Sequence, residues 1–314
     1  MATAHDPILV TGGRGYVGRW AVRRLVEMGI PVVTFDRDPW PDEPGVTAIH
    51  GELVDLAQLT RVLDEHGVDA VIHTAAISSP DMSFAMPTAT LAANVMGTAN
   101  VLEAARGAGI RRVVNFSSSS IYGWQTGPVG EGSIPAPKAT YGVSKLAAEN
   151  LATVFRSIHD LDVLSLRVCW VYGPGLRVPG EHVGQMIWAA LKGEAYRLEA
   201  GADHPLPLVF VGDVAEAAIL AAQAKSVSQP VYNVAGPRTL TLGQAAEVVR
   251  SRIPEAEIEI GPGFLPLERL GDHRVADVDI SSAGRDFNYF PVLDPVDGID
   301  GYIASLREQL GMTP

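Results

Sequence analysis

Cysteine is nearly absent from this chain, because Cys169 is the only one among 314 residues. A single cysteine excludes an internal disulfide and is typical of a reducing compartment. Cys169 lies in the apolar run from Val168 to Val171, so we expect a buried thiol and not a nucleophile. Positive charge is also scarce, with 24 basic against 36 acidic residues and a net charge of −12. This balance argues against a nucleic-acid partner, which would require clustered positive charge.

Long hydrophobic runs are missing as well, and none approaches the length of a membrane span. Residues 1–7 lack the basic and then apolar pattern of a signal peptide. The hydrophobic content of 47% nevertheless provides a large core. We therefore expect a cytoplasmic protein without a membrane partner and without a metal, whose partners are small molecules.

Short β-branched runs alternate with longer helical patterns over the first two thirds of the chain. Helical spacing and good helix formers mark 91–105 and 141–159. Strand and helix alternation of this kind predicts an α/β fold, a Rossmann-type doubly wound parallel sheet. The predicted strands are 8–10, 32–35, 46–49, 70–73, 113–116, 163–166 and, further along, 231–234.

The pattern changes from about Gly173, where prolines become frequent. We predict an NAD-binding domain from residues 1–174 and 209–239. Residues 175–208 and 240–314 are expected to form a smaller, mainly C-terminal cap that binds the substrate.

Spaced glycines lie between the first predicted strand and the helix that follows it, in the segment from Thr11 to Gly18. In this context Gly12 permits a tight turn, Gly15 lets the backbone approach a pyrophosphate, and Gly18 lets the helix pack on the strand. The helix that follows offers free amides to phosphates, which brings Tyr16 and Val17 into the predicted cofactor site.

An acidic residue, Asp36, ends the second predicted strand. A carboxylate there can accept hydrogen bonds from the hydroxyls of an adenosine ribose and would repel a 2′-phosphate. NAD is therefore favoured over NADP. Arg14 and Arg37 leave NADP open, because either could pair with a 2′-phosphate.

Tyr141 and Lys145 are four residues apart and share one face of a predicted helix. An ammonium group next to a phenol favours the phenolate, so the pair can act as general base in an oxidation and as general acid in a reduction. Taken alone, the same spacing also occurs on ordinary solvated helix faces. Four serines, 117–120, follow the strand that ends at Phe116, at the edge of the sheet where such folds bind ligands.

In the order of these motifs, the chain resembles the extended short-chain dehydrogenase/reductase family, in its NAD-dependent epimerase/dehydratase group. The resemblance covers almost the whole chain. It rests on the glycine turn, Asp36, His73-Thr74-Ala75-Ala76, Asn94-Val95-Met96-Gly97-Thr98, Ser118, Ile121-Tyr122-Gly123, Tyr141, Lys145, Arg167, Val171-Tyr172-Gly173-Pro174-Gly175, Phe210-Val211-Gly212-Asp213-Val214 and Tyr232-Asn233-Val234.

The resemblance implies an NAD-dependent enzyme that oxidises a secondary alcohol. It implies that Ser118 is the catalytic hydroxyl beside Tyr141 and Lys145, with Ser119 as the second choice. Lys145 would also reach the nicotinamide ribose. Further cofactor contacts are implied for Glu52, Leu53, Thr74, Ala75, Ala76 and Asn94.

Two departures from the family pattern bear on the reaction. Dehydratases of the family carry an Asp-Glu pair after the catalytic hydroxyl, and here Ser119 and Ser120 stand in those places, so dehydration is not expected. Members that bind nucleotide sugars hold the diphosphate with two arginines. Arg269 matches one of them, whereas Leu206 replaces the other. We assign Ser119, Ser120, Arg177 and Arg269 to the substrate site, and a substrate without a nucleotide stays open.

Three functions therefore remain possible at this point. We favour a sugar epimerase, which keeps its NAD, over a dehydrogenase of a sugar acid, polyol or hydroxy acid, which releases NADH. A non-catalytic NAD-binding protein is a remote third, because such proteins usually lose the tyrosine or the lysine. In relatives the helices that match 91–105 and 141–159 pair in a homodimer, and we expect the same here.

Overall fold

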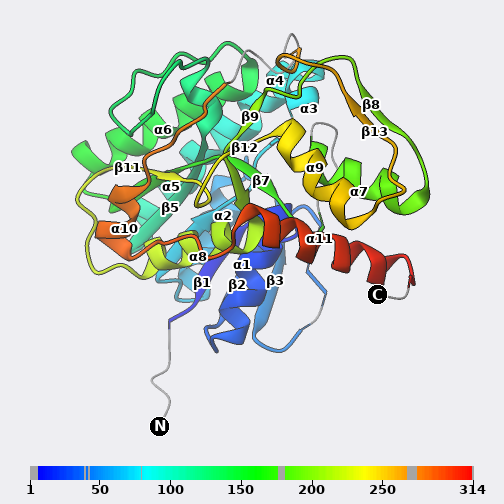
Figure 1. Cartoon of the computed structure of the whole chain (residues 1–314). Coiled ribbons are helices and arrows are strands. Elements are labelled where there is room, and N and C mark those ends of the chain that lie inside the picture. Colours follow the sequence, from blue (N-terminus) through cyan, green and yellow to red (C-terminus); the bar gives the residue numbers. More distant parts are fainter. Residues whose placement is uncertain are drawn as a thin grey trace.

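The computed structural model describes residues 6–38, 40–41, 43–78, 80–175, 181–266 and 274–312. Seven parallel strands form its central sheet in the order β11-β6-β5-β4-β1-β2-β3 (Figure 1). The strands are β1 (Ile8–Thr11), β2 (Val32–Asp36), β3 (Val46–His50), β4 (Ala70–His73), β5 (Arg112–Ser118), β6 (Val163–Val168) and β11 (Val231–Val234). This order confirms the predicted Rossmann-type sheet, and each of the seven strands predicted from the sequence is present.

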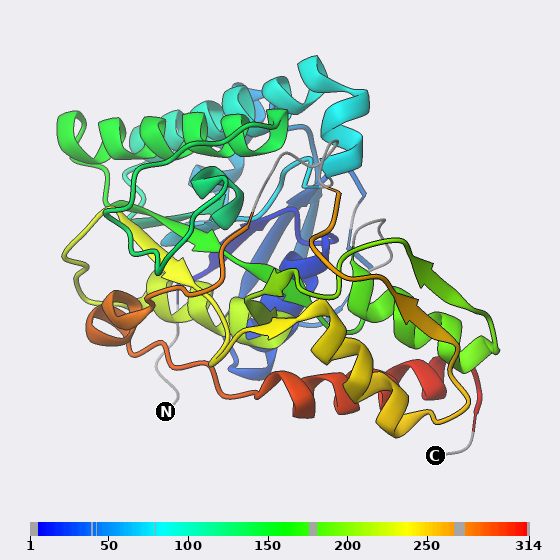
Figure 2. The ribbon, with the colours of Figure 1, turned by 45° about the horizontal axis from the view of Figure 1, so that its top comes forward.

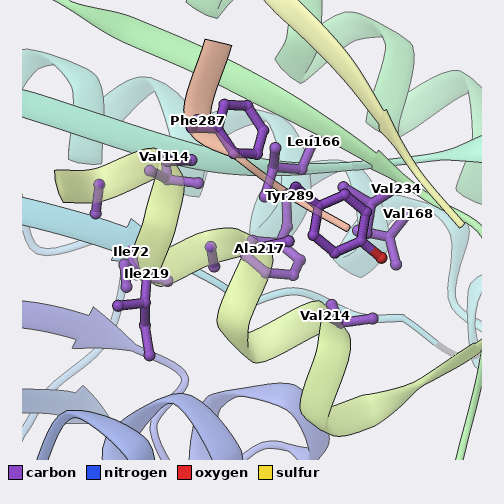
Figure 3. Packing of buried hydrophobic residues seen from close by; sticks show 14 of the residues in the cluster. Ile72, Val114, Leu166, Val168, Val214, Ala217, Ile219, Val234, Phe287 and Tyr289 are labelled. Carbon is purple, nitrogen blue, oxygen red and sulfur yellow. The ribbon is translucent and has the colours of Figure 1, made fainter. Parts of the chain in front are cut away.

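Helices cover both faces of the sheet, because successive side chains of each strand point to opposite faces. Ile8 and Val10 of β1 pack toward α1 (Tyr16–Glu27) and α8 (Val211–Gln223), and Figure 3 shows the α8 side of this core. Leu9, between them, packs toward α2 (Leu56–Glu65), α5 (Gly97–Gly107) and α6 (Thr140–Ile158). Strands buried on both faces explain why the sequence shows continuous β-branched runs.

The predicted helix over 91–105 is interrupted. It consists of α4 (Pro87–Leu91), a π-helical turn η1 (Ala92–Met96) and α5, and the short α3 (Pro80–Ala85) precedes it. The turn contains Asn94, whose buried amide exchanges two hydrogen bonds with the backbone of Ile77, at 2.8 and 3.0 Å. A π turn inserts one extra residue and is frequent at functional sites. Helical spacing alone does not reveal such an insertion.

A second hydrophobic core lies among the helices α7 (His182–Lys192), α9 (Leu242–Arg252) and α11 (Pro295–Gln309). Short strands accompany it: β7 (Trp170–Tyr172), β8 (Tyr196–Leu198), β9 (Pro205–Leu206), β10 (Leu208–Phe210), β12 (Leu240–Thr241) and β13 (Ile258–Ile260). They pair as β7 with β10, β9 with β12, and β8 with β13. Figure 2 shows these elements on one side of the large sheet.

One C-terminal helix packs in the core of the large sheet and not in this second core. Helix α10 (Ser281–Phe287) places Ala283, Phe287 and the following Tyr289 in the core between the large sheet and α8 (Figure 3). The division into an NAD-binding domain and a cap stays a prediction. The contacts of α10 join part of residues 240–314 to the large sheet.

Candidate active site

The glycine turn between β1 and α1 has the close contacts that its sequence predicts. Gly12 has φ +70°, and a Cβ atom there would lie 2.7 Å from the backbone of Ala75. A Cβ on Gly18 would lie 2.1 Å from the carbonyl oxygen of Gly12, so only glycine lets α1 approach the turn. Gly15 is the N-cap of α1 and makes no side-chain cap. The first amides of α1 are therefore available to an anion.

Asp36 lies at the carboxyl end of β2, beside the glycine turn. Its Oδ2 accepts a hydrogen bond from the amide of Arg14 at 2.9 Å, and its Oδ1 accepts one from the amide of Asp38 at 3.1 Å. These two amides fix the orientation of the carboxylate. Arg14 and Arg37 line the same cavity.

His73, at the end of β4, links the glycine turn to the π turn. Its Nδ1 is 2.7 Å from the Thr11 hydroxyl, and its Nε2 is 3.0 Å from the Thr98 hydroxyl. Thr98 donates to the carbonyl of Asn94 at 2.7 Å, so it accepts from Nε2–H, and Nδ1 accepts from Thr11. Burial lowers the pKa of His73 to about 3, which keeps the ring neutral.

Asn94 also reaches the catalytic helix. Its side-chain amide donates to the Ser144 hydroxyl at 3.0 Å, and Ser144 donates to the carbonyl of Tyr141 at 2.7 Å. Asn94 is not among the described residues that line the cavity. Its contacts instead hold Ile77 of the cavity wall and the start of α6 at a fixed separation.

Ser118, Tyr141 and Lys145 lie together at the carboxyl edge of the sheet. Ser118 ends β5, and its Oγ accepts hydrogen bonds from the Ser120 amide at 3.1 Å and the Ser120 hydroxyl at 2.9 Å. Tyr141 is hydrogen-bonded to Ser118. The Nζ of Lys145 is 5.9 Å from the centre of the Tyr141 ring and donates to the carbonyl of Phe116 at 2.7 Å.

Burial dominates the electrostatics of this trio. It raises the pKa of Tyr141, although the hydrogen bond with Ser118 opposes the rise, and it lowers the pKa of Lys145 to about 8. We expected Lys145 to lower the pKa of the phenol, but burial has the larger effect. Phenolate formation therefore needs additional positive charge nearby.

One cavity of about 720 Å³ joins these features. We call its lining residues between 12 and 93 the N-terminal wall and those between 116 and 208 the C-terminal wall. All of the predicted cofactor and catalytic residues except Asn94 line the cavity. They are Gly12, Gly15, Tyr16, Val17, Asp36, Arg37, Glu52, Leu53, Thr74, Ala75, Ala76, Ser118, Tyr141 and Lys145.

The predicted substrate residues divide into two groups. Ser119 and Ser120 line the C-terminal wall. Arg177 and Arg269 lie outside the described residues. Leu206, which replaces an arginine of the family pattern, is buried, pairs with Leu240 and also lines the wall. That position therefore offers the cavity an apolar side chain.

Several residues of the C-terminal wall were missed by sequence reasoning. Trp170 belongs to an apolar run that resembles core, and Glu181 and His182 follow a proline-rich stretch without a motif. Glu181 is buried, caps α7 by accepting from the Gly184 amide at 2.8 Å, and has its pKa raised to about 8 by burial. The Nδ1 of His182 is 2.6 Å from the Tyr196 hydroxyl, and burial lowers its pKa to about 4.

Comparison with known proteins assigns the chain to a family. The model of the NAD dependent epimerase/dehydratase family matches residues 8–235. The UDP-glucose 4-epimerase of Streptomyces lividans is 31% identical over an alignment of 261 residues, which covers 77% of this chain and 79% of that protein. The chain belongs to the NAD-dependent epimerase/dehydratase family. It is therefore an NAD-dependent enzyme, as its motifs predicted.

Other members of the family agree with this assignment. The dTDP-glucose 4,6-dehydratase of Xanthomonas campestris is 32% identical over 249 residues, 73% of this chain and 70% of that protein. The structure of MoeE5 in complex with UDP-glucuronic acid and NAD is 30% identical, with a TM-score of 0.87, and covers 97% of this chain and 100% of that one. No helix of the described ranges is long and apolar enough to cross a membrane.

The residues present suit NAD, the cofactor of the family. The uncapped start of α1 fits a pyrophosphate, and Asp36 fits a ribose diol. Lys145 would reach the nicotinamide ribose. NAD supplies the acceptor for a hydride, and the positive charge of its oxidised ring would favour the phenolate of Tyr141.

Proposed function

We propose that this protein is a sugar epimerase that inverts a hydroxyl-bearing carbon by oxidising it and reducing it again. The observation that carries the proposal is the convergence of Ser118, Tyr141 and Lys145 on one wall of the cavity that also holds the glycine turn and Asp36. Ser118 holds the oxygen of the reacting alcohol by a hydrogen bond. Tyr141 removes the hydroxyl proton during oxidation and returns it during reduction.

Lys145 supports Tyr141 through its charge. The Phe116 carbonyl holds the ammonium beside the Tyr141 ring, which stabilises the phenolate when it forms. The lowered pKa of Lys145 keeps proton exchange accessible near neutral pH. Ser119 and Ser120 carry no carboxyl group, so the site lacks an acid and base pair there to expel water.

The relatives support epimerisation and indicate where to look for the substrate. Their names specify UDP-glucose, UDP-glucuronate and dTDP-glucose as substrates, so nucleotide sugars are the first class to test. A dehydrogenase acting on a sugar without a nucleotide is the second candidate, because Leu206 removes one expected diphosphate contact.

A release assay separates the two candidates. Purified protein is denatured and the supernatant is assayed for NAD and NADH, and intact protein is incubated with UDP-glucose. We expect about one bound cofactor per chain and formation of the 4-epimer without net NADH. An empty protein that accumulates NADH with sugars or sugar acids would replace the epimerase by a dehydrogenase.

We also propose a cytoplasmic homodimer. Exposed apolar side chains follow one face of α6, with Val143 46%, Val154 43% and Ile158 68% exposed, and Leu91 and Met96 are exposed on the neighbouring α4 and η1. Figure 2 shows these helices along one outer face of the molecule.

Val154→Arg is expected to convert dimer to monomer in sedimentation experiments. Val292→Arg, at an 87% exposed valine elsewhere, is the matched control, and a wild-type protein that is monomeric at micromolar concentration would contradict the proposal.

A further inference from the structure

Three motif residues that have no part in the proposed chemistry meet behind the catalytic serines. They are Tyr122, Arg167 and Asn233. Tyr122 ends the short helix η2 (Ser119–Tyr122), which follows β5. Arg167 of β6 is the register partner of Ser117 in β5 and of Asn233 in β11. Register partners point to the same face of a sheet, so the three strands bring these side chains together on one face.

Arg167 forms a buried ion pair with Glu149 of α6. Its Nε and Nη2 donate to the two carboxylate oxygens at 3.0 and 2.7 Å, and the two residues are 5% and 2% exposed. Its Nη1 donates to the Tyr122 hydroxyl and to the carbonyl of Glu131, both at 2.9 Å. The Tyr122 hydroxyl donates in turn to Oδ1 of Asn233 at 2.6 Å. One guanidinium thus connects α6, η2 and β11.

Helix α6 also holds the end of β5, against which it packs (Figure 1). Lys145 donates to the carbonyl of Phe116 at 2.7 Å, and Glu149 accepts a hydrogen bond from the Ser117 hydroxyl at 2.7 Å. The next residue of the strand is the catalytic serine. Lys145 and Glu149 follow Tyr141 at intervals of four, so the three side chains share one face of the helix. That face therefore fixes the strand end beside the phenol.

The separation of Ser118 and Tyr141 matters for the chemistry of the phenol. Their hydrogen bond opposes the rise in the pKa of Tyr141 that burial causes. A displacement of the strand end would weaken this bond, raise the pKa further and move the hydroxyl that holds the reacting oxygen. A buried ion pair adds little net stability because desolvation offsets its attraction, whereas its bidentate hydrogen bonds fix the positions of both side chains.

We propose that Glu149 and Arg167 are positioning residues, which hold the end of β5 so that the catalytic serine stays within hydrogen-bond distance of Tyr141. The inference rests on the proposed function in one respect, that this serine and Tyr141 act on the same hydroxyl of the substrate. Glu149 and Arg167 are not among the described residues that line the cavity. They act on the site through Ser117, which binds Glu149 and precedes the catalytic serine.

Two arginine-to-lysine substitutions test the proposal, because each keeps the charge and removes the planar fork. Arg167→Lys alters the ion pair behind the serines. Arg112→Lys is the matched control, since Arg112 is equally buried, begins β5 at the opposite edge of the sheet, and pairs with Asp162 at 2.6 Å. We expect Arg167→Lys to lower kcat for epimer formation about 10-fold without changing KM or bound NAD, and Arg112→Lys to change kcat less than about twofold.

Titration of the phenol provides a readout without turnover. The difference in phenolate absorbance between each NAD-loaded protein and the same protein carrying Tyr141→Phe isolates the ionisation of Tyr141. Ser118→Ala removes the hydrogen bond directly and sets the size of the expected rise in pKa. Arg167→Lys should produce a comparable rise and Arg112→Lys none. A purely structural role would lower the melting temperature of both lysine variants and leave the pKa of Tyr141 in place.

A milder pair of variants decides the question if Arg167→Lys does not fold. Ser117→Ala removes a buried hydroxyl that donates to Glu149. Ser165→Ala, its control, removes a buried hydroxyl of β6 that accepts a hydrogen bond from β5 at 2.9 Å. We expect Ser117→Ala to raise the pKa of Tyr141 and to lower kcat about threefold, and Ser165→Ala to do neither.

Two results would overturn the inference. One is a Tyr141 titration and a kcat in Arg167→Lys and Ser117→Ala that equal those of their controls. The other is an unchanged titration in Ser118→Ala, because the contact to be positioned would then have no effect on the phenol. A wild type that forms no epimer would instead contradict the proposed function, and the titration would still decide the role of the ion pair.

Discussion

The N-terminal wall of the cavity combines the glycine turn and five alanines with charged residues such as Asp36 and Arg37, whereas the C-terminal wall presents Trp170, Glu181, His182 and Leu206. The first suits a ligand that is the same throughout the family, since amides at the glycine turn and α1 bind phosphate whatever the neighbouring side chains are. The second suits a ligand that differs among members. Main-chain amides bind the cofactor in the same way when side chains are replaced. Side chains that contact the substrate can differ between family members, so the substrate can differ as well.

The acids of the two walls illustrate this difference. Asp36 accepts hydrogen bonds from two backbone amides and lies next to arginines. Glu181 is buried, and its pKa is raised to about 8, although the Gly184 amide and Tyr302 both form hydrogen bonds with it. A carboxylate at Asp36 can accept a hydrogen bond from a hydroxyl, while a protonated Glu181 can itself donate a hydrogen bond into the cavity.

Tyr141 lies in the C-terminal wall and is the proposed proton-transferring group. Its substitution is therefore expected to have the largest effect on turnover. Tyr141→Phe removes the group that transfers the proton, and we expect kcat to fall by about 10³-fold or more while bound NAD is retained. Epimer formation at saturating substrate is the measurement. Lys225→Met, at an exposed lysine far from the motifs, controls for handling of the variants. Turnover within tenfold of the wild type in Tyr141→Phe would refute the proposed chemistry.

Glu181 is expected to make stability depend on pH. Its pKa of about 8 in the folded chain exceeds its ordinary value of 4.5, so between these values the folded chain keeps a proton that the unfolded chain has released. The contribution of Glu181 to stability therefore falls as the pH rises from about 5 to 8. We expect the difference in unfolding free energy between Glu181→Gln and the wild type to increase by ~3 kcal/mol over this window.

Urea unfolding at pH 5 and pH 8 measures this effect. Glu194→Gln, at an exposed glutamate just after α7, should show no such change between the two pH values. If the wild type and Glu181→Gln have the same pH dependence, Glu181 is ionised in the folded chain and the contrast with Asp36 disappears.

The two walls also differ in how far the sequence predicts them. The glycine turn, Asp36 and the Tyr141/Lys145 pair are local patterns with fixed spacing, and the structure brings all of them to one cavity. Asn94 was predicted to contact the cofactor, and this contact stays a prediction; its amide holds Ile77 and Ser144. Trp170 and Glu181 come from separate segments whose meeting depends on tertiary packing, and no local spacing encodes that.

The smallest effect is expected at the N-terminal wall, where Asp36→Asn keeps an oxygen acceptor but removes the charge. A hydrogen bond from a ribose hydroxyl to a carboxylate is stronger than one to a neutral amide, so the Kd of NAD should rise by about 10- to 30-fold, ~2 kcal/mol. The ratio of NADP to NAD affinity should increase, because Arg14 and Arg37 remain beside the ribose position and no carboxylate repels a 2′-phosphate. Calorimetry on cofactor-free protein measures both constants, with Asp64→Asn on the exposed face of α2 as the control. A wild type that binds NADP more tightly than NAD would show that the arginines, and not Asp36, determine the cofactor.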